Sequence, residues 1–310
     1  MQIIQKLEYP SYNFTPILGW SISRFELFDK CKRQYYYTYY SKFAQGLPQY
    51  KLTQLKNLTS VPLEIGNVVH DVIEAFLLRL QKSNSNIDEN RFFQYAKQKA
   101  DQYFLAKTFI ETYYGSIQTI DMEQAMDKIT KCLTNFIESP IYTWIFMKAI
   151  TNRNNWMIEP PGYGETRLDG LKAYCKMDFL FPVDDDIYIL DWKTGGKNTY
   201  KHTQQLIGYA AAASSNFDIQ LNTIFPKIVY LFPEFQEFEF TLKNDDFSVF
   251  FTKVKEQTKL MQSFCSNVEK NIPLPMTDFP ATPSPGICRF CNFQELCLDK
   301  KKASDLPDAF

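Results

Sequence analysis

The sequence has almost no net charge, no long apolar run and no nucleotide-binding glycine loop. Its 34 basic and 35 acidic residues nearly cancel over 310 residues, so any contact with nucleic acid requires a local patch. No stretch has the length and apolar character of a transmembrane helix, and residues 1–6 lack the apolar core of a signal peptide. We therefore expect a cytoplasmic protein without membrane contact. Residues 194–198 hold two glycines and a lysine but not the Gly-x4-Gly-Lys-Ser/Thr spacing, which argues against a P-loop motor.

Histidine is scarce as well, with two residues, whereas there are seven cysteines. An odd number of cysteines without a secretory signal argues against a disulfide framework and favours metal ligation. Cys288, Cys291 and Cys297 form a C-x2-C-x5-C pattern. A tetrahedral metal site or a cubane cluster needs four ligands, and we propose Cys31 as the fourth. Zinc on the same four thiols is the alternative.

The composition is that of an ordinary globular protein, and the helices and strands predicted along the chain make its fold class α/β. The apolar and charged fractions, 45% and 22%, are ordinary, and the length allows one large domain with an insertion. Apolar spacing predicts helices over 91–110 and 122–137, within a helical insertion at 80–155. Strand-rich runs at 227–232 and 237–242 extend a sheet.

The chemistry of the chain centres on a predicted hairpin and the helix after it. Strand-rich runs at 173–181 and 187–193 flank a polar turn at 182–186, which is the usual hairpin signal. Gly195 and Gly196 end the second strand, and a helix follows them.

Two acids and a lysine fall on this hairpin. Asp178 lies on its first strand, and Asp191 and Lys193 lie two positions apart on the second, so they share a face. The cross-strand geometry can bring the two carboxylates together, which is costly unless a cation lies between them. Oxygen ligands suit Mg²⁺ or Mn²⁺, which would activate water and polarise a phosphoryl oxygen, with Lys193 stabilising negative charge. The alternative is a hairpin with exposed acids, but Asp191 directly follows an apolar run, where charges are rarely tolerated without a role.

Further candidates lie on helices. Gly66 and His70 are four residues apart, as are Gln205 and Tyr209, so each pair shares one helix face. Gly66 would permit close approach of another element. A lone helical histidine is more often structural than a ligand. Gln205 and Tyr209 would be read as helix-edge residues without the Asp-x-Lys pair upstream.

Three other features leave alternatives open. The helix within 21–40 interleaves basic and aromatic residues, which could grip a phosphate backbone and stack bases or could pack tyrosines on a core. Glu165 either contacts the metal or one of its ligands, or is an exposed strand residue. His202 is either a solvated cap residue or a phosphate contact.

Four patches together, 21–40, 63–76, 174–209 and 286–297, resemble the PD-(D/E)XK nucleases, in particular the RecB-like branch with an iron–sulfur cluster. The series Asp178, Asp191-Trp192-Lys193, Gln205, Tyr209 is similar to that family's D…DxK…QxxxY pattern, and Gly66…His70 to its GxxxH pattern. The family's N-terminal cysteine is usually followed by proline, whereas Lys32 follows Cys31 here.

The resemblance implies a fold and a set of ligands. The fold would be a restriction-endonuclease-like mixed central sheet flanked by helices, in a single nuclease domain spanning 1–310. Cluster-binding segments at 21–40 and 279–300 would form an iron–sulfur staple that joins the two ends of the chain. The implied cofactors are Mg²⁺ or Mn²⁺ and a [4Fe–4S] cluster. Their ligands would be, for the ion, His70, Asp178, Asp191 and the Trp192 carbonyl, and, for the cluster, Cys31, Cys288, Cys291 and Cys297.

The resemblance also implies an activity. It is that of a metal-dependent DNA nuclease, a single-strand exonuclease of DNA processing, repair or CRISPR spacer acquisition, similar to AddB-type and CRISPR-adaptation exonucleases. Lys193 would assist the attacking water, and Gln205 and Tyr209 would position the DNA strand. A helicase or a CRISPR-adaptation protein would be the partner. The alternative is a non-catalytic nucleic-acid-binding or structural iron–sulfur subunit of a helicase–nuclease complex, which the near-neutral charge favours.

Overall fold

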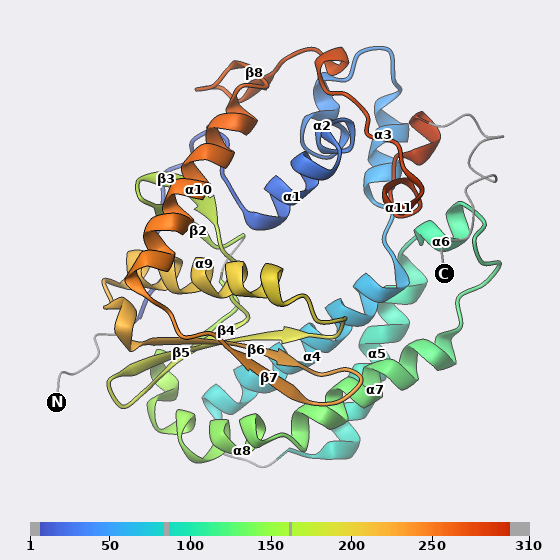
Figure 1. Cartoon of the computed structure of the whole chain (residues 1–310). Coiled ribbons are helices and arrows are strands. Elements are labelled where there is room, and N and C mark those ends of the chain that lie inside the picture. Colours follow the sequence, from blue (N-terminus) through green and yellow to red (C-terminus); the bar gives the residue numbers. More distant parts are fainter. Residues whose placement is uncertain (1–6, 84–86, 161–162, 298–310) are drawn as a thin grey trace. The chain divides into compact units, whose positions relative to one another are not determined.

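The computed structural model describes residues 7–83, 87–160 and 163–297 (Figure 1). The chain forms two compact units, each described here by itself. The first contains residues 1–13, 61–106 and 119–253, and the second contains 14–60, 107–118 and 254–310. The single-domain assignment with an insertion at 80–155 stays a prediction. Parts of the ranges predicted above, residues 1–6, 84–86 and 298–310, lie outside the described residues.

A five-stranded sheet forms the centre of the first unit. Its order is β1-β4-β5-β6-β7, with β5 and β6 parallel and the other neighbours antiparallel. The strands are β1 (Met157–Ile158), β4 (Phe179–Val183), β5 (Asp186–Lys193), β6 (Ile224–Tyr230) and β7 (Gln236–Glu239). The mixed α/β architecture is therefore confirmed, and so is the strand predicted at 187–193.

The strand predicted at 173–181 is wrong in its extent. Residues 171–174 belong to β3 (Leu171–Tyr174), which pairs with β2 (Glu165–Leu168) in a separate hairpin, whereas β4 begins only at Phe179. Residues 175–178, between β3 and β4, form backbone hydrogen bonds with two different parts of the chain. The Cys175 N–H donates to the Gly164 carbonyl at 2.9 Å, and the Asp178 carbonyl accepts from the Glu159 N–H at 3.0 Å. The chain thus leaves the β2–β3 hairpin and enters the five-stranded sheet within residues 175–178, where the alternating sequence pattern had predicted one continuous strand.

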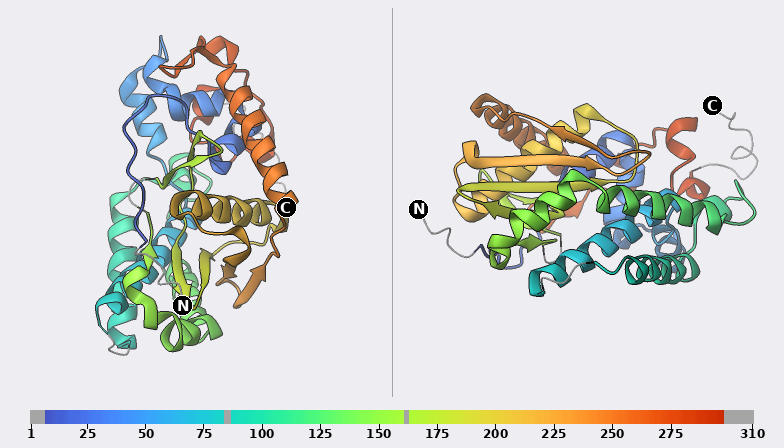
Figure 2. Two further views of the ribbon diagram at one scale, coloured as in Figure 1. Left: turned by 90° about the vertical axis from the view of Figure 1, so that its left-hand side faces the viewer. Right: turned by 90° about the horizontal axis from the view of Figure 1, so that it is seen from below.

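Helices cover both faces of the five-stranded sheet (Figures 1 and 2). One face carries α9 (Thr199–Phe217), whose buried run of four alanines at 210–213 permits a close approach. The other face carries α4, α7 and α8, and α5 packs on α4 and α7. Their bounds are α4 (Val61–Lys82), α5 (Glu89–Ala106), α7 (Met122–Ile137) and α8 (Pro140–Met147). Burial of each apolar side chain here contributes about 1.5–3 kcal/mol.

The second unit is mostly helical and has an aromatic core. Its helices are α1 (Ile22–Lys30), α2 (Lys32–Tyr40), α3 (Gln49–Lys56), α6 (Ile110–Tyr113) and α11 (Pro285–Cys288), with a small hairpin of β8 (Cys265–Asn267) and β9 (Ile272–Pro273). α10 (Asn244–Gln262) begins in the first unit and ends in the second. Short 3-10 helices lie in the first unit at Ala149–Asn155 and Leu221–Thr223, and in the second unit at Ser41–Phe43, Met276–Asp278 and Gln294–Leu296.

The tyrosines of α2 belong to this core. Tyr35, Tyr36, Tyr37 and Tyr40 are at most 2% exposed, and the Tyr36 ring lies 4.8 Å from that of Phe279. A base cannot stack on rings that are already covered. The base-stacking interpretation of this helix is therefore wrong for these four residues.

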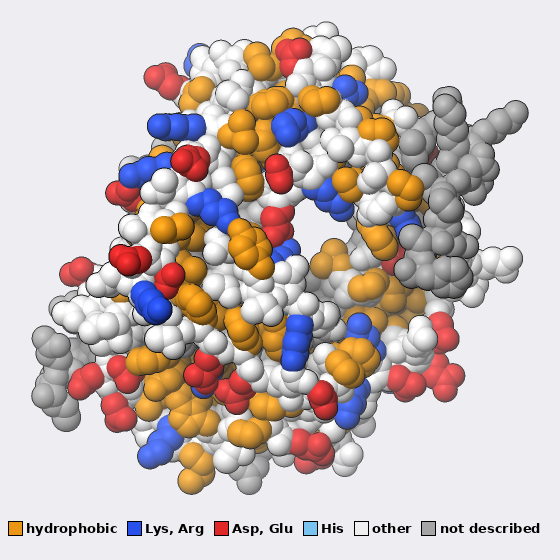
Figure 3. Space-filling model, in the orientation of Figure 1, with side chains coloured by type: hydrophobic (Ala, Val, Ile, Leu, Met, Phe, Trp, Pro, Cys, Tyr) orange, Lys and Arg blue, Asp and Glu red, His pale blue; other side chains and the backbone are white. Residues whose placement is uncertain are grey.

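Among residues 7–83, 87–160 and 163–297, no helix combines the length and apolar character needed to cross a bilayer. Acidic and basic side chains are interspersed over the face shown in Figure 3. This mixture agrees with the near-zero net charge.

Candidate active site

The β4–β5 hairpin brings Asp178 and Asp191 together. Phe179 pairs with Leu190, so Asp178, one residue before β4, faces Asp191 when the register is continued. Asp178 Oδ2 accepts a hydrogen bond from the Trp192 N–H at 2.8 Å. The two acids are only 8% and 2% exposed. The sequence prediction that both carboxylates occupy one buried volume therefore agrees with the structure.

Side chains alternate along the end of β5. The Lys193 ammonium forms an ion pair with Asp191 Oδ2, which places both on the face that α9 covers. The Trp192 ring points to the opposite face and lies 5.3 Å from Phe136 of α7. The Trp192 ring thus packs on one face of β5, while Asp191 and Lys193 face the site on the other.

Two α9 residues hold Asp191. Gln205 Nε2 donates to the Tyr209 hydroxyl at 2.7 Å, and that hydroxyl donates to Asp191 Oδ1 at 2.5 Å. Tyr209 is 5% exposed. Gln205 Oε1 is buried and accepts no hydrogen bond from the described residues. The shared face predicted for Gln205 and Tyr209 is therefore present, and it points at Asp191.

His70 reaches the site from α4. Its Nε2 donates to the Trp192 carbonyl at 3.1 Å, and its Nδ1 lies 3.4 Å from Asp178 Oδ1. One turn earlier, a Cβ added to Gly66 would lie 3.3 Å from Thr194 Oγ1. The close approach expected at Gly66 is therefore present, directly after the Asp-Trp-Lys segment.

The pKa values show how the charges share this volume. Burial raises the pKa of Asp178, but His70 and Lys193 outweigh it and hold the value below normal. Burial dominates at Asp191, and with the charge of Asp178 it raises the pKa despite Lys193. Burial lowers the pKa of Lys193, but Asp191 and Asp178 raise it above normal. Burial likewise lowers the pKa of His70, but the two acids raise it to about 9. Near neutral pH, a protonated His70 and Lys193 together therefore balance the charge of the two buried acids.

A further acid, Glu159, belongs to the site and was missed in the sequence. His70, Glu159 and Asp178 each offer a ligand atom within 4.8 Å of the others, the only such group of His, Cys, Asp or Glu found in the described part of the chain. Glu159 directly follows β1, has a φ of 41° and forms an ion pair with Lys176. No spacing in the sequence links it to Asp178, because the pairing of β1 with β4 brings it there.

The donor set fits a divalent ion. Asp191 Oδ2 is buried, contacts the Lys193 ammonium and accepts no hydrogen bond of normal geometry from the described residues. The Asp178, Asp191 and Glu159 carboxylates and the Trp192 carbonyl are oxygen donors, which suit Mg²⁺ or Mn²⁺, and His70 adds an imidazole.

The two residues left open in the sequence have definite partners. Glu165 on β2 forms ion pairs with Arg167 at 2.8 Å and Lys172 at 3.7 Å, within its own hairpin. His202 is 5% exposed, and its Nδ1 shares a hydrogen bond with the Tyr230 hydroxyl. Burial, with Lys193 and Lys201, lowers the pKa of His202 to about 4, so it is neutral near pH 7. It is therefore not a solvated cap residue.

The four predicted cluster cysteines all belong to the second unit and carry free thiols. Burial, together with the charges of Cys297, Cys31 and Cys288, raises the pKa of Cys291 to about 12. These three cysteines are thus close enough to act on Cys291. Still, no three of the four sulfurs lie within 4.8 Å of one another in the described chain. Arg33 Nε donates to the Phe279 carbonyl at 2.8 Å and ties α2 to the segment that leads to α11.

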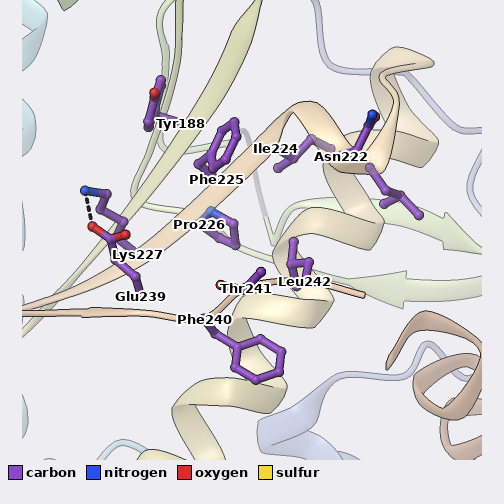
Figure 4. Close-up of a pocket in the computed structure, with 11 residues that line it drawn as sticks. Tyr188, Asn222, Ile224, Phe225, Pro226, Lys227, Glu239, Phe240, Thr241 and Leu242 are labelled. Atoms are coloured by element: carbon purple, nitrogen blue, oxygen red, sulfur yellow. Dashed lines mark ion pairs between the residues drawn. The ribbon is translucent and has the colours of Figure 1, made fainter. Parts of the chain in front are cut away.

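A separate cavity of about 410 Å³ lies at the other end of the sheet (Figure 4). Its lining includes Tyr188, Phe225 and the ion pair of Lys227 with Glu239. Ile187 pairs with Ile224 beside it, whereas Lys193 pairs with Tyr230 at the candidate site. The cavity contains none of the predicted site residues.

The fold and the site define an α/β protein with a buried acidic centre suited to a divalent metal ion. A family model described as the PD-(D/E)XK nuclease superfamily matches residues 19–298. The chain belongs to this superfamily, whose members are nucleases. No curated protein matches it. A solved structure titled "Crystal structure of SSO0001" is 16% identical, with 60% of this chain and 77% of that chain covered. The TM-score is 0.29, which is too low to indicate a shared fold.

Proposed function

We propose that the chain is a metal-dependent DNA nuclease that acts as an exonuclease on single-stranded ends. One observation carries this proposal: Asp178, Asp191 and Lys193 converge at the end of the hairpin, with His70 against them, in one largely buried volume. Membership in the superfamily supports nuclease chemistry. The choice of DNA, of single strands and of exonuclease mode is supported by the resemblance to the RecB-like branch.

We assign the metal to His70, Asp178, Asp191 and the Trp192 carbonyl, with Glu159 as an additional candidate ligand. When bound, Mg²⁺ or Mn²⁺ would lower the pKa of a coordinated water and polarise a phosphoryl oxygen. The assignment is supported by the buried Asp191 Oδ2, which lacks a hydrogen bond from the described residues, and by the grouping of His70, Glu159 and Asp178.

Lys193 would act as a charge rather than as a base. Its raised pKa keeps the ammonium protonated at neutral pH, so it cannot accept a proton from water. It can donate hydrogen bonds to the attacking water and to a phosphoryl oxygen as negative charge develops there. Its ion pair with Asp191 fixes the ammonium beside the acids before substrate binds.

Tyr209 and Gln205 act through Asp191. The Tyr209 hydroxyl donates to Asp191 Oδ1, and Gln205 Nε2 holds that hydroxyl. This relay leaves Oδ2 for the cation and the lysine, so both residues are positioning residues of the carboxylate. A direct contact of Gln205 and Tyr209 with the DNA strand is supported by the resemblance alone, since Gln205 Oε1 is buried.

We further propose that Cys31, Cys288, Cys291 and Cys297 bind a [4Fe–4S] cluster, with zinc as the alternative. The number and type of donors support this, as do the free thiols and their mutual electrostatic effect. A helicase or a CRISPR-adaptation protein as partner is supported by the resemblance alone.

The deciding experiment measures cleavage of end-labelled single- and double-stranded DNA by anaerobically purified protein with Mg²⁺, Mn²⁺ or chelator. We expect metal-dependent products from wild type and a loss of at least roughly 100-fold in Asp191→Asn, because that variant removes a charge at the reacting centre. Glu239→Gln, which breaks an acid–lysine pair at the other end of the sheet, is the matched control and should cleave like wild type.

The product pattern tests the finer proposals. A ladder that shortens from one end indicates an exonuclease, whereas internal products refute that mode. If fully metal-loaded wild type binds DNA but cleaves none, the non-catalytic binding module replaces the enzyme. If it neither binds nor cleaves, the structural subunit does.

A further inference from the structure

A second cavity of the first unit is lined by backbone segments that lead to candidate metal ligands. It has a volume of about 250 Å³ and is lined by residues 9–12 of the N-terminal segment, Pro160, Gly164 and Glu165. Pro160 directly follows Glu159, which groups with His70 and Asp178. Gly164 accepts a hydrogen bond from Cys175, three residues before Asp178. One wall of the cavity is thus continuous with the backbone that carries two candidate metal ligands.

The cavity presents aromatic faces beside a cation. The Arg167 guanidinium lies 4.0 Å from the centre of the Tyr12 ring, and the Tyr9 ring lies 5.6 Å from that of Phe217. Aromatic rings and arginine planes are the groups on which unpaired bases stack, in a manner that tolerates any base. Unlike the tyrosines of α2, Tyr9 and Tyr12 are only partly buried and line an open cavity.

The cavity also has a polar side. The Tyr9 hydroxyl is itself buried, so Tyr9 contributes its ring to the lining, whereas Glu165 contributes a charged group. Glu165 offers a carboxylate that can accept from the exocyclic amino group of a base. Glu165 also forms ion pairs with Arg167 and Lys172, which fix the position of its carboxylate.

The position of the wall is fixed by the backbone at Gly164. Its φ is +65°, and an added Cβ would lie 2.3 Å from the Cys175 carbonyl oxygen. Only glycine fits this close approach. The rim of the cavity is therefore held against the segment 175–178 that leads to Asp178, as a subsite with a fixed distance to the reacting centre requires.

We propose that this cavity binds one base of the nucleic-acid strand, from the nucleotide beside the cleaved phosphate. The base would stack against Tyr9 and Tyr12, with the Glu165 carboxylate available to its edge. The volume is below the roughly 300–1,000 Å³ of most small-molecule sites, so it takes a single base rather than a folded oligonucleotide. This inference rests on the proposed nuclease function.

The test measures binding of labelled single-stranded oligonucleotides by the full-length Lys193→Ala variant with Mn²⁺, so that cleavage does not interfere. In a series of oligonucleotides, one abasic residue is moved along the strand. We expect one position at which the missing base weakens binding by about 5- to 150-fold, the range given by stacking of a single base. Adding Tyr12→Ala or Tyr9→Ala should weaken binding of the complete strand and remove the effect of that abasic position.

Tyr95→Ala is the matched control, because Tyr95 on α5 also lies beside a cation, Lys99, at 5.7 Å. It should leave both measurements unchanged. Tyr9→Phe, which keeps the ring, separates loss of stacking from loss of folding, and it should retain the abasic effect. Unchanged binding by folded Tyr9 and Tyr12 variants would overturn the subsite while leaving the nuclease proposal intact. Absence of both DNA binding and cleavage in wild type would overturn both.

Discussion

Single atoms of Asp191 have distinct surroundings. Oδ1 accepts from Tyr209, whereas Oδ2 contacts Lys193 and accepts no normal hydrogen bond from the described residues. A carboxylate this buried is costly to keep charged, and burial raises its pKa. A bound cation would reverse that penalty. The hydrogen bonds from Gln205 through Tyr209 therefore orient a carboxylate whose negative charge a bound metal ion would stabilise further, in addition to Lys193.

Tyr209→Phe tests the relay at the scale of one hydroxyl. A hydrogen bond to a charged group contributes roughly 1.5–3 kcal/mol, so we expect cleavage to slow by about 10- to 150-fold. Because Asp191 would be less well oriented, the Mn²⁺ concentration for half-maximal activity should rise as well. Initial rates measured across a Mn²⁺ titration check both effects.

Tyr40→Phe is the control for losing a tyrosine hydroxyl elsewhere. It removes a hydrogen bond to Asn271 Oδ1 at 2.6 Å in the second unit. This variant should change thermal stability without changing the Mn²⁺ midpoint. A Tyr209→Phe enzyme with a wild-type midpoint and rate would show that the relay does not position Asp191.

The site residues differ in how far the sequence revealed them. Asp191 and Lys193 were found because strand alternation places residues two apart on one face, and Tyr209 because helical spacing places it one turn after Gln205. Glu159 carries no such signature. It reaches the site through the pairing of β1 with β4, a long-range contact that local periodicity does not encode. Tyr9 likewise meets its cavity only through tertiary packing.

Whole elements show the same limit. The strand at 187–193 could be predicted because its apolar run is bounded by turn residues and ends in glycines. The strand predicted at 173–181 was wrong because alternation continues through residues 175–178, while their backbone bonds change from Gly164 to Glu159. Which partner a backbone group bonds is decided by tertiary contacts.

Gly66→Ala tests how tightly α4 is held beside the strand end. Alanine favours a helix over glycine by about 1 kcal/mol, but its Cβ would meet Thr194 Oγ1 at 3.3 Å. We expect the free energy of unfolding to change by less than about 1 kcal/mol. Cleavage should nevertheless fall several-fold, because moving α4 shifts His70 from Asp178 and the Trp192 carbonyl. Denaturant unfolding and initial cleavage rates measure the two effects separately.

A second substitution sharpens this test. Thr194→Ala removes the atom that the new methyl group meets, so the double variant Gly66→Ala/Thr194→Ala should recover activity that Gly66→Ala lost. Full activity of the single variant would mean that α4 accommodates the added methyl group without displacing His70. Failure of the double variant to recover would mean that another contact sets the position of His70.

At the scale of the whole molecule, the two candidate centres fall in different units. The acidic site belongs to the first unit and the four cysteines to the second. Near-neutral net charge leaves little long-range attraction for DNA, so affinity must come from local groups such as Lys193 and the Tyr9–Tyr12 cavity. Binding should accordingly depend less steeply on salt than it does for strongly basic proteins.

A cluster on Cys31, Cys288, Cys291 and Cys297 would join distant parts of the chain and restrict the unfolded state. By the loop-entropy argument used for disulfides, such a link contributes on the order of 5 kcal/mol. We therefore expect Cys291→Ala to lose its iron and sulfide and to unfold at a lower temperature than wild type. Iron, zinc and acid-labile sulfide per chain, together with thermal unfolding of anaerobically purified protein, measure this.

Cys265→Ala is the matched control, because Cys265 is a half-buried cysteine of the same unit outside the C-x2-C-x5-C pattern. It should retain the iron content of wild type. Its unfolding temperature should change only by what a small packing defect costs, since the Cys265 thiol contacts Tyr40 and Asn271 rather than the other cysteines. Zinc without sulfide in wild type would replace the iron–sulfur cluster by a zinc site on the same thiols. A metal content that is equal in Cys291→Ala and wild type would remove Cys291 from the ligand set.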